Sequence, residues 1–126
     1  MPVDAQAVAR LMQDARQHLV TAHLALEAGD LAGAFQLAYD GARKSLTAVA
    51  LARGLRAKGE GAHMTLITLI QVELASAPGI AVVGKLDRLR RTRNKAEYSG
   101  HWFDHDEVDE AIEVSRAIVE WTSAQT

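Results

Sequence analysis

The sequence contains no cysteine, no leader-like start and no apolar run that approaches the roughly 18 residues of a membrane span. Without cysteine, neither a disulfide nor a thiolate metal site can form, and this agrees with a reducing compartment. Residues 1–8 lack the basic start and long apolar stretch of a signal peptide. These absences predict a cytoplasmic protein that does not enter a membrane.

Several catalytic motifs are also missing. The glycines in residues 54–61 lack the preceding strand and the following Lys-Ser/Thr of a phosphate loop, and no serine lies in a nucleophile-elbow context. His101 and His105 are four residues apart, with aspartates nearby, and could hold a metal only if that turn were helical. Ser99-Gly100 favours a loop instead. The sequence therefore predicts neither a metal nor a cofactor.

What the sequence does contain is a regular series of helical patterns. Turn signals at Gly29-Asp30, Gly54, Pro78-Gly79 and Ser99-Gly100 separate segments whose apolar residues recur every three to four positions. These segments predict five helices at about 4–28, 31–53, 62–75, 80–98 and 105–123. At 126 residues the chain is expected to be one domain, residues 1–126, and short connections favour an all-α up-and-down bundle.

The formal net charge of −2 hides an asymmetry. Residues 104–120 contain seven acidic residues and a single arginine. The segment before them is basic, with Lys85, Arg88, Arg90, Arg91, Arg93 and Lys95. Neighbouring segments of opposite charge usually lie side by side and partly neutralise each other. Two interpretations remain open: a solvated charged surface, or an anionic ligand on the basic helix.

Arg93 interrupts an apolar stripe in the fourth predicted helix, which otherwise contains Val82, Leu86, Leu89 and Ala96. A guanidinium near a core must find an anion or a ring of acceptors. The adjacent stripe places Arg90, Asn94 and Tyr98 on the same side as Arg93.

Together these four side chains suit a phosphodiester, with cations for phosphate oxygens and polar groups for a sugar hydroxyl. The alternative is local ion pairing, because Arg93 and Glu97, like Asp87 and Arg91, are four residues apart.

Three segments resemble the HEPN family, small all-helical proteins of prokaryotic toxin–antitoxin and phage-defence systems. Arg93-Asn-Lys-Ala-Glu-Tyr98 resembles the family signature, an Arg commonly followed by a polar residue and then by a His four to six positions after the Arg. Ala38–Leu46 resembles the second-helix segment, and Gly61-Ala-His63 the start of the third helix. The resemblance implies a HEPN-like bundle.

In catalytic HEPN proteins the Arg and His act on RNA without metal. The resemblance therefore implies a metal-independent endoribonuclease site to which Arg93 and Asn94 carry over, with Tyr98 as the third candidate. The positive charge of Arg88, Arg90, Arg91 and Lys95 predicts that the same helix binds RNA. However, Tyr98 occupies the position of the His, and His101 lies outside the family window. A phenol titrates near pH ~10 and is a poor acid–base catalyst at neutrality, so weak or absent cleavage is expected.

The resemblance also implies partners. We expect a homodimer in which the two motif helices line a shared basic cleft. The alternative is a catalytically inactive accessory or neutralising subunit of a partner such as a nucleotidyltransferase. Trp102-Phe103 is expected to cover the core, with an oligomer contact as the alternative.

Overall fold

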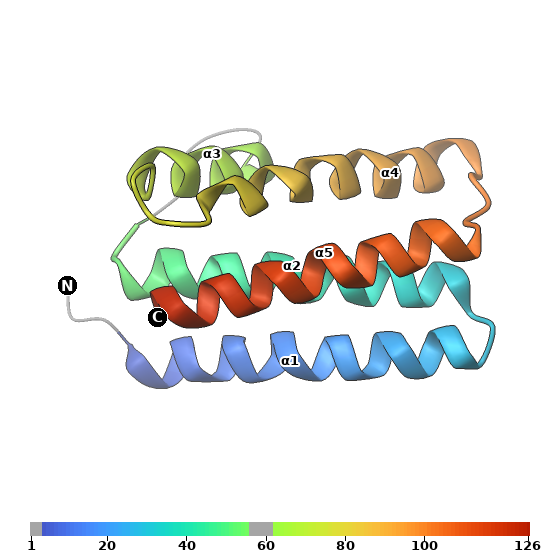
Figure 1. The fold of residues 1–126 in the computed structure, drawn as a ribbon, viewed down its shortest axis with the longest axis horizontal. Coiled ribbons are helices and arrows are strands. Elements are labelled where there is room, and N and C mark those ends of the chain that lie inside the picture. The colour runs from blue at the N-terminus through green and yellow to red at the C-terminus, as the bar shows by residue number, and fades with distance from the viewer. Residues whose placement is uncertain (1–3, 56–61) are drawn as a thin grey trace.

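The structure, a computed structural model, describes residues 4–55 and 62–126. For residues 62–65 it describes the backbone but not the side chains. Within these residues the chain forms five α-helices and a 3₁₀ turn, η1, and no strand: α1 (Ala5–Glu27), α2 (Leu31–Ala52), α3 (Ala62–Glu73), η1 (Ile80–Gly84), α4 (Lys85–Ser99) and α5 (His105–Gln125). The helices run up and down along a common axis, with α3 and α4 at one edge of the bundle, α1 at the opposite edge, and α2 and α5 between them (Figure 1). The prediction of an all-α bundle is confirmed.

Aspartates begin three of the helices. Asp4 accepts a hydrogen bond from the Ala7 backbone N–H at 3.0 Å, and Asp30 accepts one from Gly33 at 2.9 Å. Asp104 and Glu107 form a reciprocal capping box at the start of α5. Each cap satisfies backbone donors that a helix start would otherwise leave unpaired. The predicted starts of these helices therefore agree with the structure to within one residue.

The core is centred on α2, which packs against each of the other four α-helices. Its buried face carries the large residues Phe35, Tyr39 and Leu46 and several alanines. These small residues let α1 approach closely: a Cβ added at Gly41 of α2 would lie only 3.1 Å from the Ala15 carbonyl oxygen. On the facing side, α5 buries Val108, Ala111, Ile112, Ser115 and Val119.

The prediction of a fourth helix over 80–98 is wrong at its start. Ile80–Gly84 is a 3₁₀ turn, and α4 begins at Lys85. Gly79 at the turn has no side chain to cap a helix, and β-branched residues in 80–84 favour the α-helix less. Gly79 also adopts φ +82°, where an added Cβ would lie 3.0 Å from Trp121 Cδ1. The Trp121 indole N–H donates to the Pro78 carbonyl at 2.8 Å and holds the turn against α5.

The expectation that Trp102-Phe103 covers the core is right for one residue and wrong for the other. Phe103 stacks on Phe35, with ring centroids 4.5 Å apart, whereas Trp102 is 88% exposed. The two side chains are consecutive in the loop between the left-handed Gly100 and the Asp104 cap, where the chain is not helical. Neighbouring residues in such a loop can point to opposite sides, and only Phe103 points inward.

The Gly61-Ala-His63 segment lies partly outside the described residues, since Gly61 and the side chains that follow it are among those excluded. Within the described chain, none of the helices has the length and apolar character that crossing a membrane requires.

Candidate functional site

Arg93 lies where α4 crosses α2. Its guanidinium carbon is 4.8 Å from the centroid of the Tyr39 ring on α2, and Arg93 Nη2 approaches the Asn94 side-chain oxygen at 3.4 Å. The Nε–H group is buried and has no hydrogen-bond partner among the described residues. No ion pair joins Arg93 to Glu97 or to any other carboxylate in the described part of the chain. The ion-pair interpretation of Arg93 is therefore wrong.

The stability balance at Arg93 is close to zero. A cation–π contact of this kind contributes about 0.5–2 kcal/mol. A buried donor without a partner costs about 1–3 kcal/mol. The two effects have similar size and opposite sign, so the fold gains little from a guanidinium here.

The Tyr39 phenol lies in the electrostatic field of Arg93 and of two further arginines. Burial raises the pKa of the Tyr39 phenol, and the positive charges of Arg93, Arg43 and Arg90 oppose that shift. The Tyr39 side chain is 2% exposed and forms the floor on which Arg93 rests. Tyr39 therefore belongs to the site, and Arg43, one turn further along α2, adds positive charge near it. Sequence reasoning did not assign them a role, although both lie in the Ala38–Leu46 segment that resembles the family.

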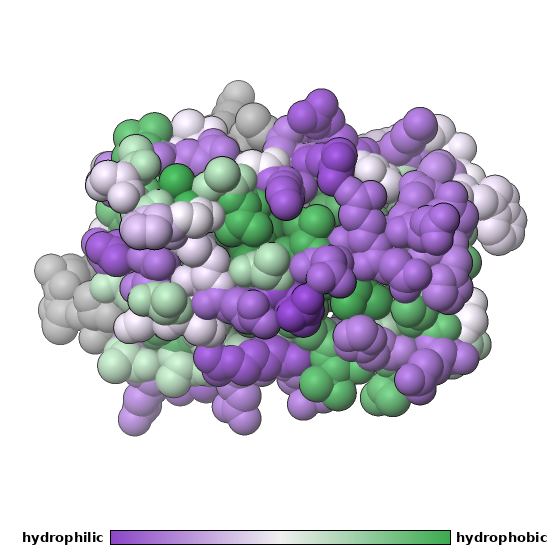
Figure 2. All heavy atoms as spheres, viewed as in Figure 1, coloured by the Kyte–Doolittle hydropathy of each residue, from purple (hydrophilic) through white to green (hydrophobic). Residues whose placement is uncertain are grey.

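The predicted RNA-binding arginines are engaged in ion pairs. Arg90 and Arg91 both pair with Asp87, at 2.9 and 2.8 Å, and Arg88 pairs with Glu110 of α5. Hydrogen bonding from Arg90, assisted by Arg91, lowers the pKa of Asp87 below its ordinary value. The expected Asp87–Arg91 pair and the expected contact between basic and acidic segments are thus confirmed. Figure 2 shows hydrophilic side chains gathered where the end of α4 and the start of α5 lie side by side.

Such pairs leave the exposed arginines able to bind another anion. An ion pair between exposed side chains is typically worth about 0–1 kcal/mol, so a phosphate can exchange for the carboxylate at little cost. Lys95 is exposed and forms no ion pair with a described residue. Arg90 differs from the others, because its side chain is only 20% exposed and lies near Tyr39.

The structure brings together two of the three predicted catalytic residues. Asn94 is half-buried and contacts Arg93. Tyr98 is 86% exposed and does not line the cavity beside Arg93. The geometry therefore places Arg93 and Asn94 in one site and leaves the Tyr98 phenol at the surface.

Two cavities adjoin each other at this end of the bundle. The first, of about 350 Å³, is lined by Arg93 together with Ala32, Gly33, Phe35, Gln36, Ala96, Glu97 and Phe103. The second, of about 400 Å³, includes His101 and shares Ala32 and Phe103 with the first. His101 Nε2 lies 2.8 Å from Glu107 Oε2, which orients the imidazole toward α5. An imidazole that lies outside the family spacing is thus a neighbour of the Arg93 cavity.

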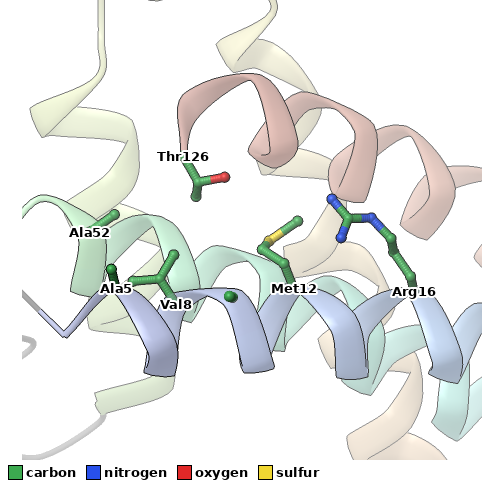
Figure 3. Close-up of a pocket in the computed structure, with 7 residues that line it drawn as sticks. Ala5, Val8, Met12, Arg16, Ala52 and Thr126 are labelled. Atoms are coloured by element: carbon green, nitrogen blue, oxygen red, sulfur yellow. The ribbon is translucent and has the colours of Figure 1, made fainter.

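A larger cavity, of about 480 Å³, lies at another place in the bundle. Figure 3 shows Val8, Met12 and Arg16 of α1 around it, with Ala52 of α2 and Thr126 at the chain end. Arg16 donates to the Ser123 hydroxyl at 2.9 Å. No residue of α4 lines this cavity, so it is separate from the Arg93 site.

The histidines considered as metal ligands have different carboxylate partners. His101 pairs with Glu107, while His105 Nδ1 lies 3.1 Å from Asp109 Oδ2. Among the described residues, no group of three or more His, Cys, Asp or Glu side chains is arranged to hold a metal ion.

These features define a class: a small up-and-down helical bundle with a polar, arginine-containing helix packed on a central apolar one. The family model described as HEPN domain matches residues 8–125, so the chain belongs to the HEPN family. No curated protein and no solved structure matches the chain. Membership in this family suggests a function related to RNA or to toxin–antitoxin and defence systems.

Proposed function

We propose that this HEPN protein binds RNA through the polar face of α4, as part of a toxin–antitoxin or phage-defence module. Arg93 contacts a phosphate, and Arg90 and Asn94 frame it. The observation that carries the proposal is the Arg93 guanidinium, which rests on Tyr39 with a buried Nε–H group that lacks an acceptor. A phosphate oxygen supplies such an acceptor, and charge-assisted hydrogen bonds of this kind are the stronger ones.

The basic face extends the site beyond one phosphate. Arg88, Arg91 and Lys95 are exposed on α4 and add positive charge along the helix. Each phosphate neutralised by such a residue releases counterions and makes the affinity dependent on salt. The bound strand competes with Asp87 and Glu110 for these arginines.

Charge reversal tests this proposal. In the variant Arg90→Glu/Arg91→Glu, RNA binding is expected to weaken strongly and the logarithmic salt slope to flatten. Each lost contact with a single strand should reduce the slope by about 0.7. Fluorescence anisotropy of a labelled oligoribonucleotide at several salt concentrations measures both.

The matched control is Arg10→Glu/Arg53→Glu, which reverses two exposed arginines outside α4. This control should change binding much less. Equal losses in the two double variants would show that RNA responds only to net charge and would remove α4 as the site.

We expect any ribonuclease activity to be weak and independent of metal, because the exposed Tyr98 phenol supplies no efficient acid–base group. Tyr98→His introduces an imidazole within the family window and should raise cleavage of a labelled RNA severalfold, with no effect of EDTA on either protein. Tyr98→Phe is the control and should leave the basal rate unchanged. Cleavage abolished by the chelator would instead indicate a metal site and contradict this account.

We propose that the functional unit is a homodimer that pairs through α4 and forms a shared basic cleft. Tyr98 and Trp102 are 86% and 88% exposed, and large aromatic side chains are enriched at protein interfaces. Analytical ultracentrifugation at tens of micromolar should give a dimer, and Tyr98→Ala/Trp102→Ala should shift it toward monomer. A wild-type protein that sediments only as a monomer would contradict the proposal.

The same two exposed aromatic residues support a second candidate function, a catalytically inactive module that binds a partner such as a nucleotidyltransferase. In that case Tyr98 and Trp102 contact the partner, and Arg93 has no RNA to bind. A stable complex with such a protein, together with no measurable RNA affinity at low salt, would favour this function.

A further inference from the structure

The cavity beside Arg93 contains an unusual combination of charges. Arg93 and Glu97 lie on consecutive turns of α4 and both line it, yet they do not form an ion pair. Gln36 reaches the cavity from α2. A cation and a carboxylate that line one cavity without pairing suit a ligand that carries an anion and hydrogen-bond donors.

The other walls suit a flat ring. Phe103 lines the cavity and is fixed by its stacking on Phe35, with an angle of 28° between the rings. Ala32, Gly33 and Ala96 are small and leave the space open. The volume of about 350 Å³ is near the lower end of small-ligand sites, which start at about 300 Å³. Unpaired bases in RNA recognition stack on aromatic side chains in this way.

The polar groups of this cavity favour one RNA base over the others. Gln36 donates one of its two amide N–H groups to Asp40 at 3.1 Å and keeps its carbonyl oxygen as an acceptor. The Glu97 carboxylate offers acceptors only. Guanine presents two adjacent donors on its Watson–Crick edge, the N1–H and the 2-amino group, whereas each other RNA base presents one donor group there. A carboxylate can accept both guanine donors side by side.

We propose that this cavity binds one unpaired guanine of the RNA, stacked on Phe103, with Glu97 accepting from its N1–H and 2-amino groups while Arg93 holds the adjoining phosphate. The inference rests on the proposed function and adds a base preference to it. It also gives Glu97 a role in RNA recognition, which neither the charge pattern nor the family signature assigns.

The test compares three hexaribonucleotides that differ at one central position, which is guanine, inosine or adenine. Inosine lacks only the 2-amino group. The wild-type protein should bind the guanine strand about tenfold more tightly than the inosine strand, and the adenine strand more weakly still. Glu97→Gln replaces one acceptor with a donor and should abolish this preference. Glu113→Gln, which removes an equal charge from the exposed face of α5, should preserve it.

The outcomes separate the two proposals. In one outcome the wild-type protein binds all three strands equally, and Arg93→Met abolishes that binding. This result would overturn the guanine cavity and leave the proposed RNA site at Arg93 intact. A Glu97→Gln variant that binds all strands more tightly but keeps the guanine preference would show simple charge repulsion and also overturn the guanine cavity. Failure of the wild-type protein to bind any strand, or binding indifferent to Arg93→Met, would overturn the proposed function and the base preference with it.

Discussion

Arg93→Met should leave the melting temperature unchanged or raise it, while RNA binding falls by about tenfold to a hundredfold. The loss corresponds to one charge-assisted interaction of about 1.5–3 kcal/mol. The fold tolerates the change because Met fills the stripe between Leu89 and Ala96, and no carboxylate is left without its cation. Circular dichroism melting and anisotropy binding measure the two effects on the same samples.

Arg93→Lys is the informative companion. Lysine keeps the charge but lacks the planar group that rests on Tyr39 and contacts a phosphate in two places. We expect intermediate binding. A well-folded Arg93→Met protein with wild-type RNA affinity would show that Arg93 is not a phosphate contact.

Phe35→Ala should destabilise the protein by about 3–5 kcal/mol, the usual cost of removing a buried aromatic side chain. Phe35 is 1% exposed and supports Phe103, so its removal both opens the core and releases the wall of the Arg93 cavity. Against a typical total stability of about 5–15 kcal/mol, this loss is large. Urea unfolding followed by circular dichroism should show a lower midpoint at similar slope.

The loop itself provides the control. Trp102→Ala removes a larger aromatic side chain that is 88% exposed, and at protein concentrations where both variants are monomeric it should change stability by no more than about 0.5 kcal/mol. Phe103→Ala should fall between the two. Similar losses for Phe35→Ala and Trp102→Ala would contradict the packing described for this end of the bundle.

Much of the fold could be predicted from the sequence because its signals are local. Caps such as Asp30 and Asp104, and apolar residues at helical spacing, mark each helix within a few neighbouring residues. The start of α4 could not be predicted from such local signals. There the Pro78-Gly79 turn is set by Trp121, which is distant in sequence, and the apolar pattern continues smoothly through the 3₁₀ turn.

The site was predicted only in part, for a related reason. Arg93 could be singled out, because it breaks a stripe on its own helix. Whether it pairs with Glu97 or rests on Tyr39 depends on how α4 packs against α2, which no local pattern encodes. That packing also places Tyr39, Arg43 and Gln36 of α2 near Arg93, and no pattern within α4 indicates them.

The central claim is that Arg93 binds an RNA phosphate, and the side-chain Nε–Hε signals of the arginines test it most directly. In a nitrogen–proton NMR spectrum of the labelled protein, titration with a short single-stranded RNA at low salt should shift the Arg93 signal most, because its buried Nε–H group gains an acceptor. Arg90 should shift less, and Arg116, which is paired on α5, should not move. An Arg93 signal that stays in place while the RNA binds would contradict the account.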